Sequence, residues 1–261
     1  KEMAQVPGRE AALQTIGQIK QYKDYADERD FPAKHGTTRL SGHLKFGTVS
    51  PREVFAAVKD LFGTDHSLIT ELLWRDFYSH LLYHKPELLG QEMQEKYRGT
   101  IDWNDSQDDF EAWCNGQTGY PIVDAAMREL NETGWMHNRM RMVTASFLIK
   151  DLQIDWRKGE KYFAQHLLDY DPASNNGGWQ WAASTGADAQ PYFRIFNPWS
   201  QQKKFDAECE YIKKYVPELQ DLDPKTIHAI ETAGLPTGVD YTSVMVDHKQ
   251  SREATLQMYK D

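Results

Sequence analysis

The fold is decided by residues 134–186, which read GWMHNRMRMVTASFLIKDLQIDWRKGEKYFAQHLLDYDPASNNGGWQWAASTG. The first part of this stretch predicts a buried helix, because apolar side chains recur at roughly helical spacing and the residues in the middle have small side chains. Polar groups at Asn138, Arg139 and Arg141 interrupt the apolar surface. The apolar positions are Met136, Met140, Val143, Phe147 and Ile149.

The second part of the same stretch is polar and rich in glycine. Asp169 and Asp171 lead into residues 175–178, which read NNGG, and Trp179 and Trp181 follow. We expect a turn-rich loop here, because glycine allows close approach of a neighbouring backbone and asparagine amides supply donors and acceptors together. Residues 134–186 therefore form either a buried helix followed by a loop packed by tryptophans, or part of a binding site.

The composition is that of a globular protein. A chain of 261 residues with 40% hydrophobic residues forms one large domain or two small ones, with an ample core. No run is long and apolar enough to span a membrane, and the N-terminus lacks the apolar region of a signal peptide. Two cysteines, Cys114 and Cys209, are too few for a disulfide framework or a cysteine zinc site, so we expect a reducing, intracellular environment.

The charge and the aromatic content leave two questions open. The net charge of -9 argues weakly against nucleic-acid binding. That inference fails if basic residues gather on one face, because phosphates sense the local field. Aromatic residues make up 12% of the chain, with 8 tryptophans. They form either a tryptophan-rich core or an aromatic pocket for a flat, conjugated ligand.

Start and stop signals predict an all-α chain of many capped helices, without a convincing strand. The strongest start is a capping box in which Ser50 is the N-cap, Pro51 the first helical residue and Glu53 the third. We expect that helix to run to about Asp60 and to stop near Gly63. The other predicted helices cover residues 9–25, 65–84, 102–116, 121–134, 207–215 and 224–234, and a last helix begins at about residue 251.

A hydroxyl-rich loop at residues 37–42 is either an ordinary polar turn or a phosphate cradle. Hydroxyls, backbone N–H groups and a guanidinium suit a diphosphate. The loop consists of Thr37, Thr38, Arg39, Leu40, Ser41 and Gly42. No GxGxxG and no Walker motif occurs in the chain, so a Rossmann or P-loop nucleotide site is not expected.

A stripe of polar and aromatic side chains shares one face of the predicted helix at 65–84. Its members are Glu71, Trp74, Arg75 and Tyr78, at spacings of three and four residues. Such groups are costly to bury without purpose, although the stripe could also be a solvated face with a Glu71–Arg75 ion pair. His80 and His84 have the spacing of a metal pair, but no third ligand is evident, so we expect no metal.

Two segments resemble the photolyase/cryptochrome family, and more narrowly the class I cyclobutane pyrimidine dimer (CPD) photolyases. They read TGYPIVDAAMRELNETGWMHNRMRMVTASFLIKDLQIDWRKGEKYF and NNGGWQWAASTG, and the resemblance extends from Tyr25 to the tail. It implies an all-α, multi-helix FAD-binding domain over residues 1–261, with residues 1–24 as the end of a linker and the first helix. The family's N-terminal α/β domain is not in this sequence, and an antenna pigment is expected only with that domain.

The resemblance implies a non-covalent FAD, active in its reduced form. In the family, Asp169 would pair with Arg141 through two hydrogen bonds and fix the pocket wall. Asn175 matches the position that faces ring nitrogen 5 of the flavin. Plant and animal cryptochromes typically carry another residue there, so Asn175 favours a repair enzyme. The positions that match the cofactor site are Tyr25, Thr37, Thr38, Arg39, Leu40, Ser41, Arg75, Asn138, Arg141, Asp169, Asp171 and Asn175.

The resemblance also implies a pocket for the damaged bases. Trp74 and Trp181 match the two tryptophans that sandwich the dimer, and Glu71 matches the carboxylate that hydrogen-bonds it. Asn138 and Met142 match residues that line this pocket, and Arg139 matches a phosphate contact. A (6-4) photolyase typically has histidine where this chain has Met142, which argues against (6-4) repair. The lesion must leave the duplex to enter such a pocket, as in other enzymes that act on bases, photolyases among them.

Three further tryptophans, Trp179, Trp156 and Trp103, match the family's electron relay, although they could also serve core packing alone. Together these matches imply light-driven repair of CPDs in DNA, with Glu71, Asn175 and the relay tryptophans as catalytic residues. The alternative is a cryptochrome-like blue-light photoreceptor that signals through a partner. We expect a monomer without membrane association, cytoplasmic in a prokaryote and nuclear or organellar in a eukaryote.

Overall fold

The computed structural model describes residues 5–260, and the regular structure in that range is helical, as predicted. The only strand-like pairing among these residues is an isolated bridge between Asn104 and Ile154. The α-helices are α1 Arg9–Gly17, α2 Tyr25–Glu28, α3 Ser41–Lys45, α4 Pro51–Phe62, α5 Ser67–His84, α6 Gln107–Asn115, α7 Pro121–Thr133, α8 Asn138–Ser146, α9 Trp156–His166, α10 Pro172–Ala182, α11 Pro198–Phe205, α12 Glu210–Tyr215, α13 Pro224–Ala233 and α14 His248–Met258. Short 3-10 turns lie at Ile19–Tyr22, Pro86–Leu89, Glu95–Tyr97 and Pro217–Leu219, and a π-turn lies at Phe147–Asp151.

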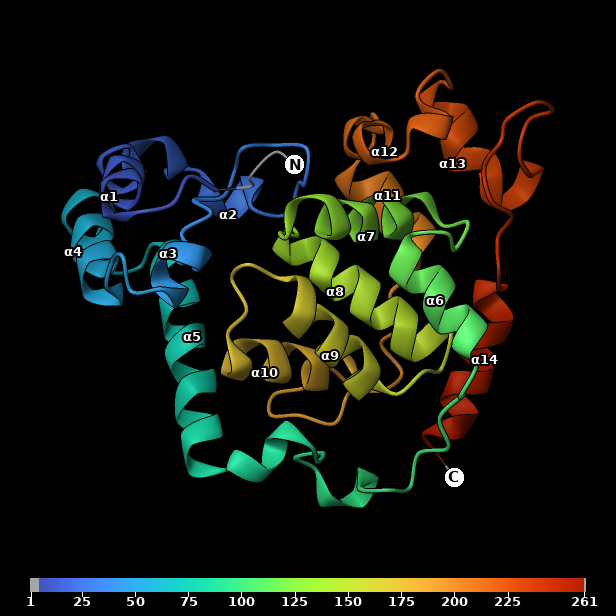
Figure 1. Cartoon of the computed structure of the whole chain (residues 1–261), viewed down its shortest axis with the longest axis horizontal. Helices are drawn as coiled ribbons and strands as arrows, with labels where there is room; N and C mark the ends of the chain where they lie inside the picture. The colour runs from blue at the N-terminus through green and yellow to red at the C-terminus, as the bar shows by residue number, and fades with distance from the viewer. Residues whose placement is uncertain (1–4, 261) are drawn as a thin grey trace.

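The helices pack around two main hydrophobic cores, and a third, small cluster is formed by Tyr97, Ile101 and Tyr259. A small core is formed by buried residues of α1, α4, α5 and their connections, and a large core by residues of α6 to α12 and the segments that follow. In Figure 1 helices α1 to α4 lie together at one side, and α5 descends from them beside the central group α7 to α10. Helix α10 contacts α5, α8 and α9, so it lies where the two groups meet.

The predicted capping box at the start of α4 is present. The Glu53 backbone N–H donates to Ser50 Oγ at 3.2 Å, and the Ser50 N–H donates to the Glu53 carboxylate at 2.9 Å. The helix runs to Phe62, two residues beyond the predicted end, and stops at Gly63 with a φ of 85°. The next helix, α5, begins at Ser67 and not at Asp65, because the His66 side chain accepts the Leu68 N–H and caps it.

The predicted buried helix is confirmed in α8 and the π-turn that continues it. All five apolar positions are inaccessible to solvent: Met136, Met140, Val143, Phe147 and Ile149. The C-terminal helix α14 packs on this π-turn and contacts it through side-chain hydrogen bonds. The Thr255 hydroxyl donates to the Lys150 carbonyl at 2.6 Å, and His248 Nδ1 lies 2.5 Å from the buried Asp151 carboxylate. Burial, opposed by His248, raises the pKa of Asp151 to about 6.

The prediction of a turn-rich loop at residues 175–178 is wrong, since these residues lie inside α10. Asp171 is the N-cap, its carboxylate accepts the Ser174 N–H at 2.9 Å, and Pro172 is the first helical residue. One of the two glycines, Gly177, has a packing role. A Cβ on Gly177 would lie 2.1 Å from the Tyr78 ring of α5, whereas a Cβ on Gly178 would meet nothing within 4 Å. Glycine therefore allows α5 and α10 to approach each other.

Several predicted boundaries also change. The segment 9–25 is not one helix but α1, a 3-10 turn and the start of α2. The helix expected over 102–116 begins only at Gln107, where Ser106 caps it by accepting the Asp109 N–H. Helix α11 was not predicted, and α14 begins at His248, three residues before the expected start, because Asp247 caps it.

Candidate functional site

The structure brings half of the predicted site residues to three neighbouring helices. Helix α10 contacts both α5 and α8, and in Figure 1 α5 runs alongside the group that contains α8 and α10. These three helices carry Glu71, Trp74 and Arg75 on α5, Asn138, Arg139, Arg141 and Met142 on α8, and Asn175, Trp179 and Trp181 on α10.

Arg141 and Asp169 form the predicted pair. Arg141 Nη2 lies 3.0 and 2.8 Å from the two oxygens of Asp169, whose side chain is only 1% exposed. One nitrogen therefore serves both oxygens. The Nε–H of the same guanidinium donates to the Met136 carbonyl at 2.8 Å. The charged pair thus joins the start of α8 rigidly to the segment before α10, because both ends of the guanidinium are fixed.

Asn175 has a fixed side-chain orientation. Its amide nitrogen donates to both the backbone carbonyl and the carboxylate of Glu160 on α9, at 3.1 and 2.9 Å. Burial raises the pKa of Glu160, and the hydrogen bond from Asn175 partly opposes that shift. Sequence reasoning missed Glu160, since a separation of fifteen residues across two helices leaves no local signal.

The hydroxyl-rich loop before α3 is present, but Arg39 does not turn toward its hydroxyls. The Arg39 guanidinium lies over the Trp135 ring, 4.3 Å from its centroid, and the residue has a left-handed φ of 52°. Within the loop, Thr38 Oγ1 accepts the Leu40 N–H at 3.3 Å. The loop therefore offers hydroxyl and backbone groups, while the Arg39 charge is used in a cation–π contact.

Tyr25, at the start of α2, is buried, and burial raises the pKa of its phenol. The hydroxyl therefore stays protonated at neutral pH and can donate a hydrogen bond.

The alternative of a Glu71–Arg75 ion pair on α5 is wrong. Glu71 pairs instead with Arg29, the residue after α2, while Arg75 lies 3.9 Å from Asp76. Burial raises the pKa of Glu71 and the Arg29 charge opposes this. A separation of 42 residues explains why sequence reasoning missed Arg29.

Trp74 is an exposed indole on the same helix. It is 39% exposed although it packs edge-on against Phe77 and stacks on Tyr78, with centroid distances of 5.6 and 6.0 Å. Its counterpart Trp181 on α10 is half-buried, with its ring 6.3 Å from that of Phe196. Two accessible indoles on helices in contact can offer stacking faces to flat rings.

The N-terminal turn of α8 holds the other predicted lesion contacts. The Asn138 side chain is exposed and its amide lies 3.9 Å from Met142 Sδ. Arg139 forms an ion pair with Asp30 at 2.7 Å. His137 caps the helix through Nδ1, which accepts the Arg139 N–H at 3.2 Å, and burial lowers the pKa of this histidine to about 4.

Two of the predicted relay tryptophans meet through α9. The ring of Trp179 lies against Gly159, where a Cβ would come within 2.2 Å of the indole. Trp156 begins the same helix, is 0% exposed, and its indole N–H lies 3.4 Å from a carboxylate oxygen of Glu92. Both indoles are therefore inside the protein.

The third, Trp103, lies closer to the surface. The Asn104 N–H donates to the Gln153 carbonyl at 2.8 Å, and the bridge to Ile154 holds this segment beside the residues that precede Trp156. Trp103 is partly exposed and meets the Tyr259 ring edge-on at 6.4 Å. The three indoles thus run from the interior of α10 toward solvent.

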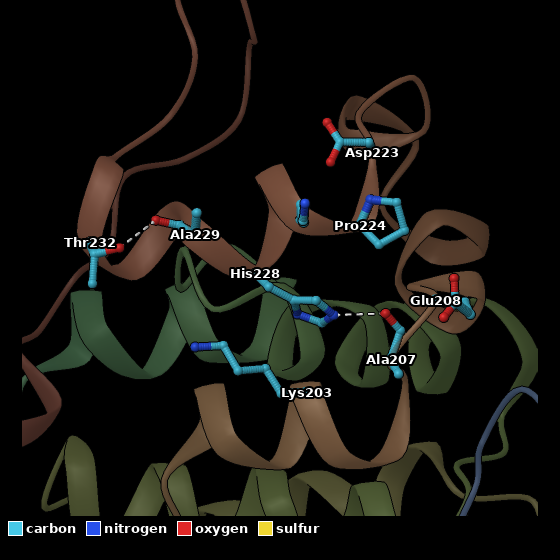
Figure 2. Close-up of a pocket in the computed structure, with 9 residues that line it drawn as sticks. Lys203, Ala207, Glu208, Asp223, Pro224, His228, Ala229 and Thr232 are labelled. Atoms are coloured by element: carbon cyan, nitrogen blue, oxygen red, sulfur yellow. Dashed lines mark hydrogen bonds between the residues drawn. The ribbon is translucent and has the colours of Figure 1, made fainter.

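A surface pocket lies away from these residues, between α11 and α13. It measures about 660 Å³ and is lined by Lys203, Glu208, Asp223, Lys225 and His228 among others. Figure 2 shows His228 hydrogen-bonded to the Ala207 carbonyl and side chains of both charge signs around the opening. The pocket contains none of the predicted cofactor or lesion residues.

Within residues 5–260 no group of histidine, cysteine and carboxylate side chains could hold a metal ion, so His80 and His84 have no third ligand. Both cysteines are buried and free. In the same range no helix combines the length and the hydropathy that a membrane span requires.

Comparison with known proteins identifies the family. A family model described as the FAD binding domain of DNA photolyase matches residues 68–261. The deoxyribodipyrimidine photo-lyase of Vibrio cholerae is 49% identical over 244 residues, which cover 91% of this chain and 52% of that protein. A solved archaeal photolyase from Sulfolobus tokodaii, which holds two FAD molecules, is 42% identical with a TM-score of 0.89, covering 100% of this chain and 58% of that one.

A solved cryptochrome from Synechocystis sp. PCC6803 is also similar, with 36% identity, a TM-score of 0.89 and coverage of 98% of this chain and 56% of that one. The chain spans about half the length of the curated relatives it matches. Since the family model covers more than half of the chain, and the solved relatives share its helical fold throughout, the chain belongs to the photolyase/cryptochrome family as a DNA photolyase FAD-binding domain.

Proposed function

We propose that this protein repairs cyclobutane pyrimidine dimers in DNA by light-driven electron transfer from reduced FAD. The observation that carries the proposal is the pairing of two accessible indoles, Trp74 and Trp181, with the partly buried carboxylate of Glu71 on contacting helices. Stacking faces beside a hydrogen-bonding group suit a pair of fused bases better than they suit a protein surface.

The residues of this chain fit FAD. A diphosphate needs neutral donors and positive charge, and the loop at 37–41 supplies hydroxyls while Arg75 is a partly buried guanidinium. The Arg141–Asp169 pair would border the isoalloxazine, and Asn175, oriented by Glu160, would present its amide to the ring. Bound there, reduced FAD would supply light-driven one-electron donation to the lesion, with no net redox change.

The roles of the protein side chains follow from their surroundings. Trp74 and Trp181 would stack on the two bases and exclude water from them, which is worth about 1–3 kcal/mol per base. Glu71 is partly buried beside the stacking face of Trp74, where its carboxyl group would be within reach of the polar edge of a bound base, and burial raises its pKa while the Arg29 charge opposes this. Arg29, at the same carboxylate, adds a positive charge beside that site.

The tryptophans Trp179, Trp156 and Trp103 would convert oxidised flavin to its reduced form in the light before repair begins, by passing electrons inward from an external reductant at the surface. Their order of depth supports this role, since the outermost indole is partly exposed and the inner two are buried. The enzyme would act as a monomer on DNA from which the dimer has been flipped out.

The decisive experiment is illumination of the reduced, FAD-loaded protein with an oligonucleotide that contains one dimer. We expect the ultraviolet absorbance of the oligonucleotide to rise as the C5–C6 double bonds are restored and two intact pyrimidines to be recovered, with no reaction in the dark. A flavin-loaded protein that reduces under blue light but splits no dimer would refute repair and favour the photoreceptor alternative, which the likeness to a cryptochrome keeps open.

A further inference from the structure

Two consecutive residues of opposite charge, Arg29 and Asp30, each pair with a predicted lesion-site residue. Arg29 pairs with Glu71 of α5, and Asp30 Oδ2 accepts a hydrogen bond from Arg139 Nη2 of α8 at 2.7 Å. Arg29 and Asp30, in the short segment after α2, therefore link α5 to α8. Neither contact was predicted from the sequence.

The segment is held in this position by the residue that follows. The Phe31 ring packs edge-on against Phe205 of α11 at a centroid distance of 6.0 Å, and the Arg139 guanidinium lies 4.6 Å from the centroid of the same Phe205 ring. The Phe205 ring therefore contacts both the segment that carries Asp30 and the guanidinium of Arg139, and it holds the two charged groups next to each other. An ion pair held in this way loses less side-chain entropy when it forms.

The Asp30–Arg139 pair is accessible from solvent on its acidic side. The side chain of Asp30 is 34% exposed, whereas that of Arg139 is 17% exposed. Asp30 is the one anionic partner of Arg139 among residues 5–260, and the buried Arg139 Nε has no hydrogen-bond partner in that range. The Arg139 guanidinium therefore has an unpaired N–H donor, and its single carboxylate partner is partly exposed.

A carboxylate and a phosphate present the same chemistry to a guanidinium, namely two negatively charged acceptor oxygens. A phosphate that approaches Arg139 meets a site whose charge is already neutralised, and it must either displace the carboxylate or bind beside a second negative charge. We propose that Asp30 is an internal substitute for a DNA phosphate, which holds Arg139 in place in the free protein and competes with the DNA backbone for it. The inference rests on the proposed function, because it requires that Arg139 faces DNA.

Competition of this kind weakens binding to every DNA backbone alike. It would therefore suppress binding to the large excess of undamaged DNA, while a flipped-out dimer gains additional affinity from Trp74 and Trp181 that undamaged DNA lacks. Asp30 acts here as a positioning residue for Arg139, since its carboxylate contacts the arginine and not the lesion.

The test compares Asp30→Asn with Glu218→Gln. Both changes remove one carboxylate from a partly buried arginine pair, because Glu218 contacts Arg128 at 2.8 Å with side chains 31% and 22% exposed. The Glu218 pair lies between α7 and the turn after α12, outside the lesion site. We expect Asp30→Asn to bind undamaged and dimer-containing duplexes about two- to fivefold more tightly at 0.1 M salt. It should also steepen the salt dependence by about 0.9 in log–log slope.

Glu218→Gln should change neither quantity, and the gain of Asp30→Asn should disappear in the double variant with Arg139→Gln. Asp30→Ser, which also lacks the charge, must act in the same direction, and retained flavin and an unchanged melting temperature show that the variants are folded. Equal affinity of Asp30→Asn and Glu218→Gln, or weaker binding by Asp30→Asn, overturns the proposal. If the protein binds damaged and undamaged DNA equally well, the proposed repair function is refuted. A gain in affinity of Asp30→Asn for both duplexes would even then support competition between Asp30 and the DNA phosphates.

Discussion

Replacing Gly177 by alanine is expected to push α5 away from α10. An alanine Cβ here would lie 2.1 Å from Tyr78 Cδ1 and 2.8 Å from Tyr78 Cγ. Carbon atoms pack at about 3.5–4.0 Å, so the two groups must separate by about 1.4 Å or more. Rotation about the Cβ–Cγ bond leaves Cγ in place, so the clash is relieved only if Tyr78 leaves its χ1 rotamer or the backbone of one helix moves.

The neighbouring glycine supplies a matched control for the magnitude. Overpacking costs about 1–3 kcal/mol, and alanine recovers about 1 kcal/mol over glycine in a helix interior, so G177A should lose about 0–2 kcal/mol. A Cβ on Gly178 meets nothing within 4 Å, so G178A should gain about 0.4–1 kcal/mol. The two variants should differ by about 1–3 kcal/mol, because they share the propensity term and differ in the clash.

The assay is urea denaturation of both variants together with their affinity for a dimer-containing oligonucleotide. Trp74 lies one turn before Tyr78 on α5, and Trp181 lies one turn after Gly177 on α10. A wider separation of the helices should therefore move the two indoles apart and weaken lesion binding in G177A, while G178A keeps it. If G177A proved as stable as G178A, the packing argument for this glycine would be refuted.

Three further predictions concern single sites. W74A should lose about 1–3 kcal/mol of lesion affinity yet keep flavin photoreduction. W103F should lose photoreduction and still split dimers when the flavin is reduced beforehand. Equal loss of photoreduction in both variants would contradict separate roles for the two tryptophans. Burial lowers the pKa of His137 to about 4, so the wild-type protein should lose up to about 3 kcal/mol as the pH falls from 6.5 to 4, since the unfolded chain takes up the proton. Asparagine in H137N keeps an acceptor for the helix cap but takes up no proton, so this variant should not show that part of the loss in stability. The measurement is the free energy of unfolding from urea denaturation at pH 7 and 4.5. S50A should destabilise the protein by about 1 kcal/mol through loss of the α4 cap, and an unchanged unfolding midpoint would contradict it.

Local rules predicted the elements whose signals lie close together in the sequence. The capping box of Ser50 and Glu53 lies within four residues, and the apolar positions from Met136 to Ile149 recur at roughly helical spacing along one continuous segment, so the cap and the buried helix were both predicted correctly. The loop predicted at 175–178 was wrong, because the prediction gave the two glycines more weight than the helix N-cap at Asp171. The reason for the first of them is tertiary, since Gly177 accommodates the Tyr78 ring of a helix far away in the sequence.

The candidate site shows the same division. The Arg141–Asp169 pair was expected from resemblance to a known family and is formed, although through one nitrogen. The contacts of Glu71 with Arg29 and of Asn175 with Glu160 were not predicted, because no periodicity connects residues on separate helices.

The docking of α14 onto the π-turn at Phe147–Asp151 has a consequence for synthesis on the ribosome. The hydroxyl of Thr255 donates to the carbonyl of Lys150, a residue synthesised about a hundred residues earlier, and the Tyr259 hydroxyl donates to the Ala183 carbonyl. These contacts cannot form until residues 248–259 have left the exit tunnel. A premature stop codon just before residue 248 would remove these partners from the centre of the nascent protein, and such a chain would be a substrate for chaperones and proteases.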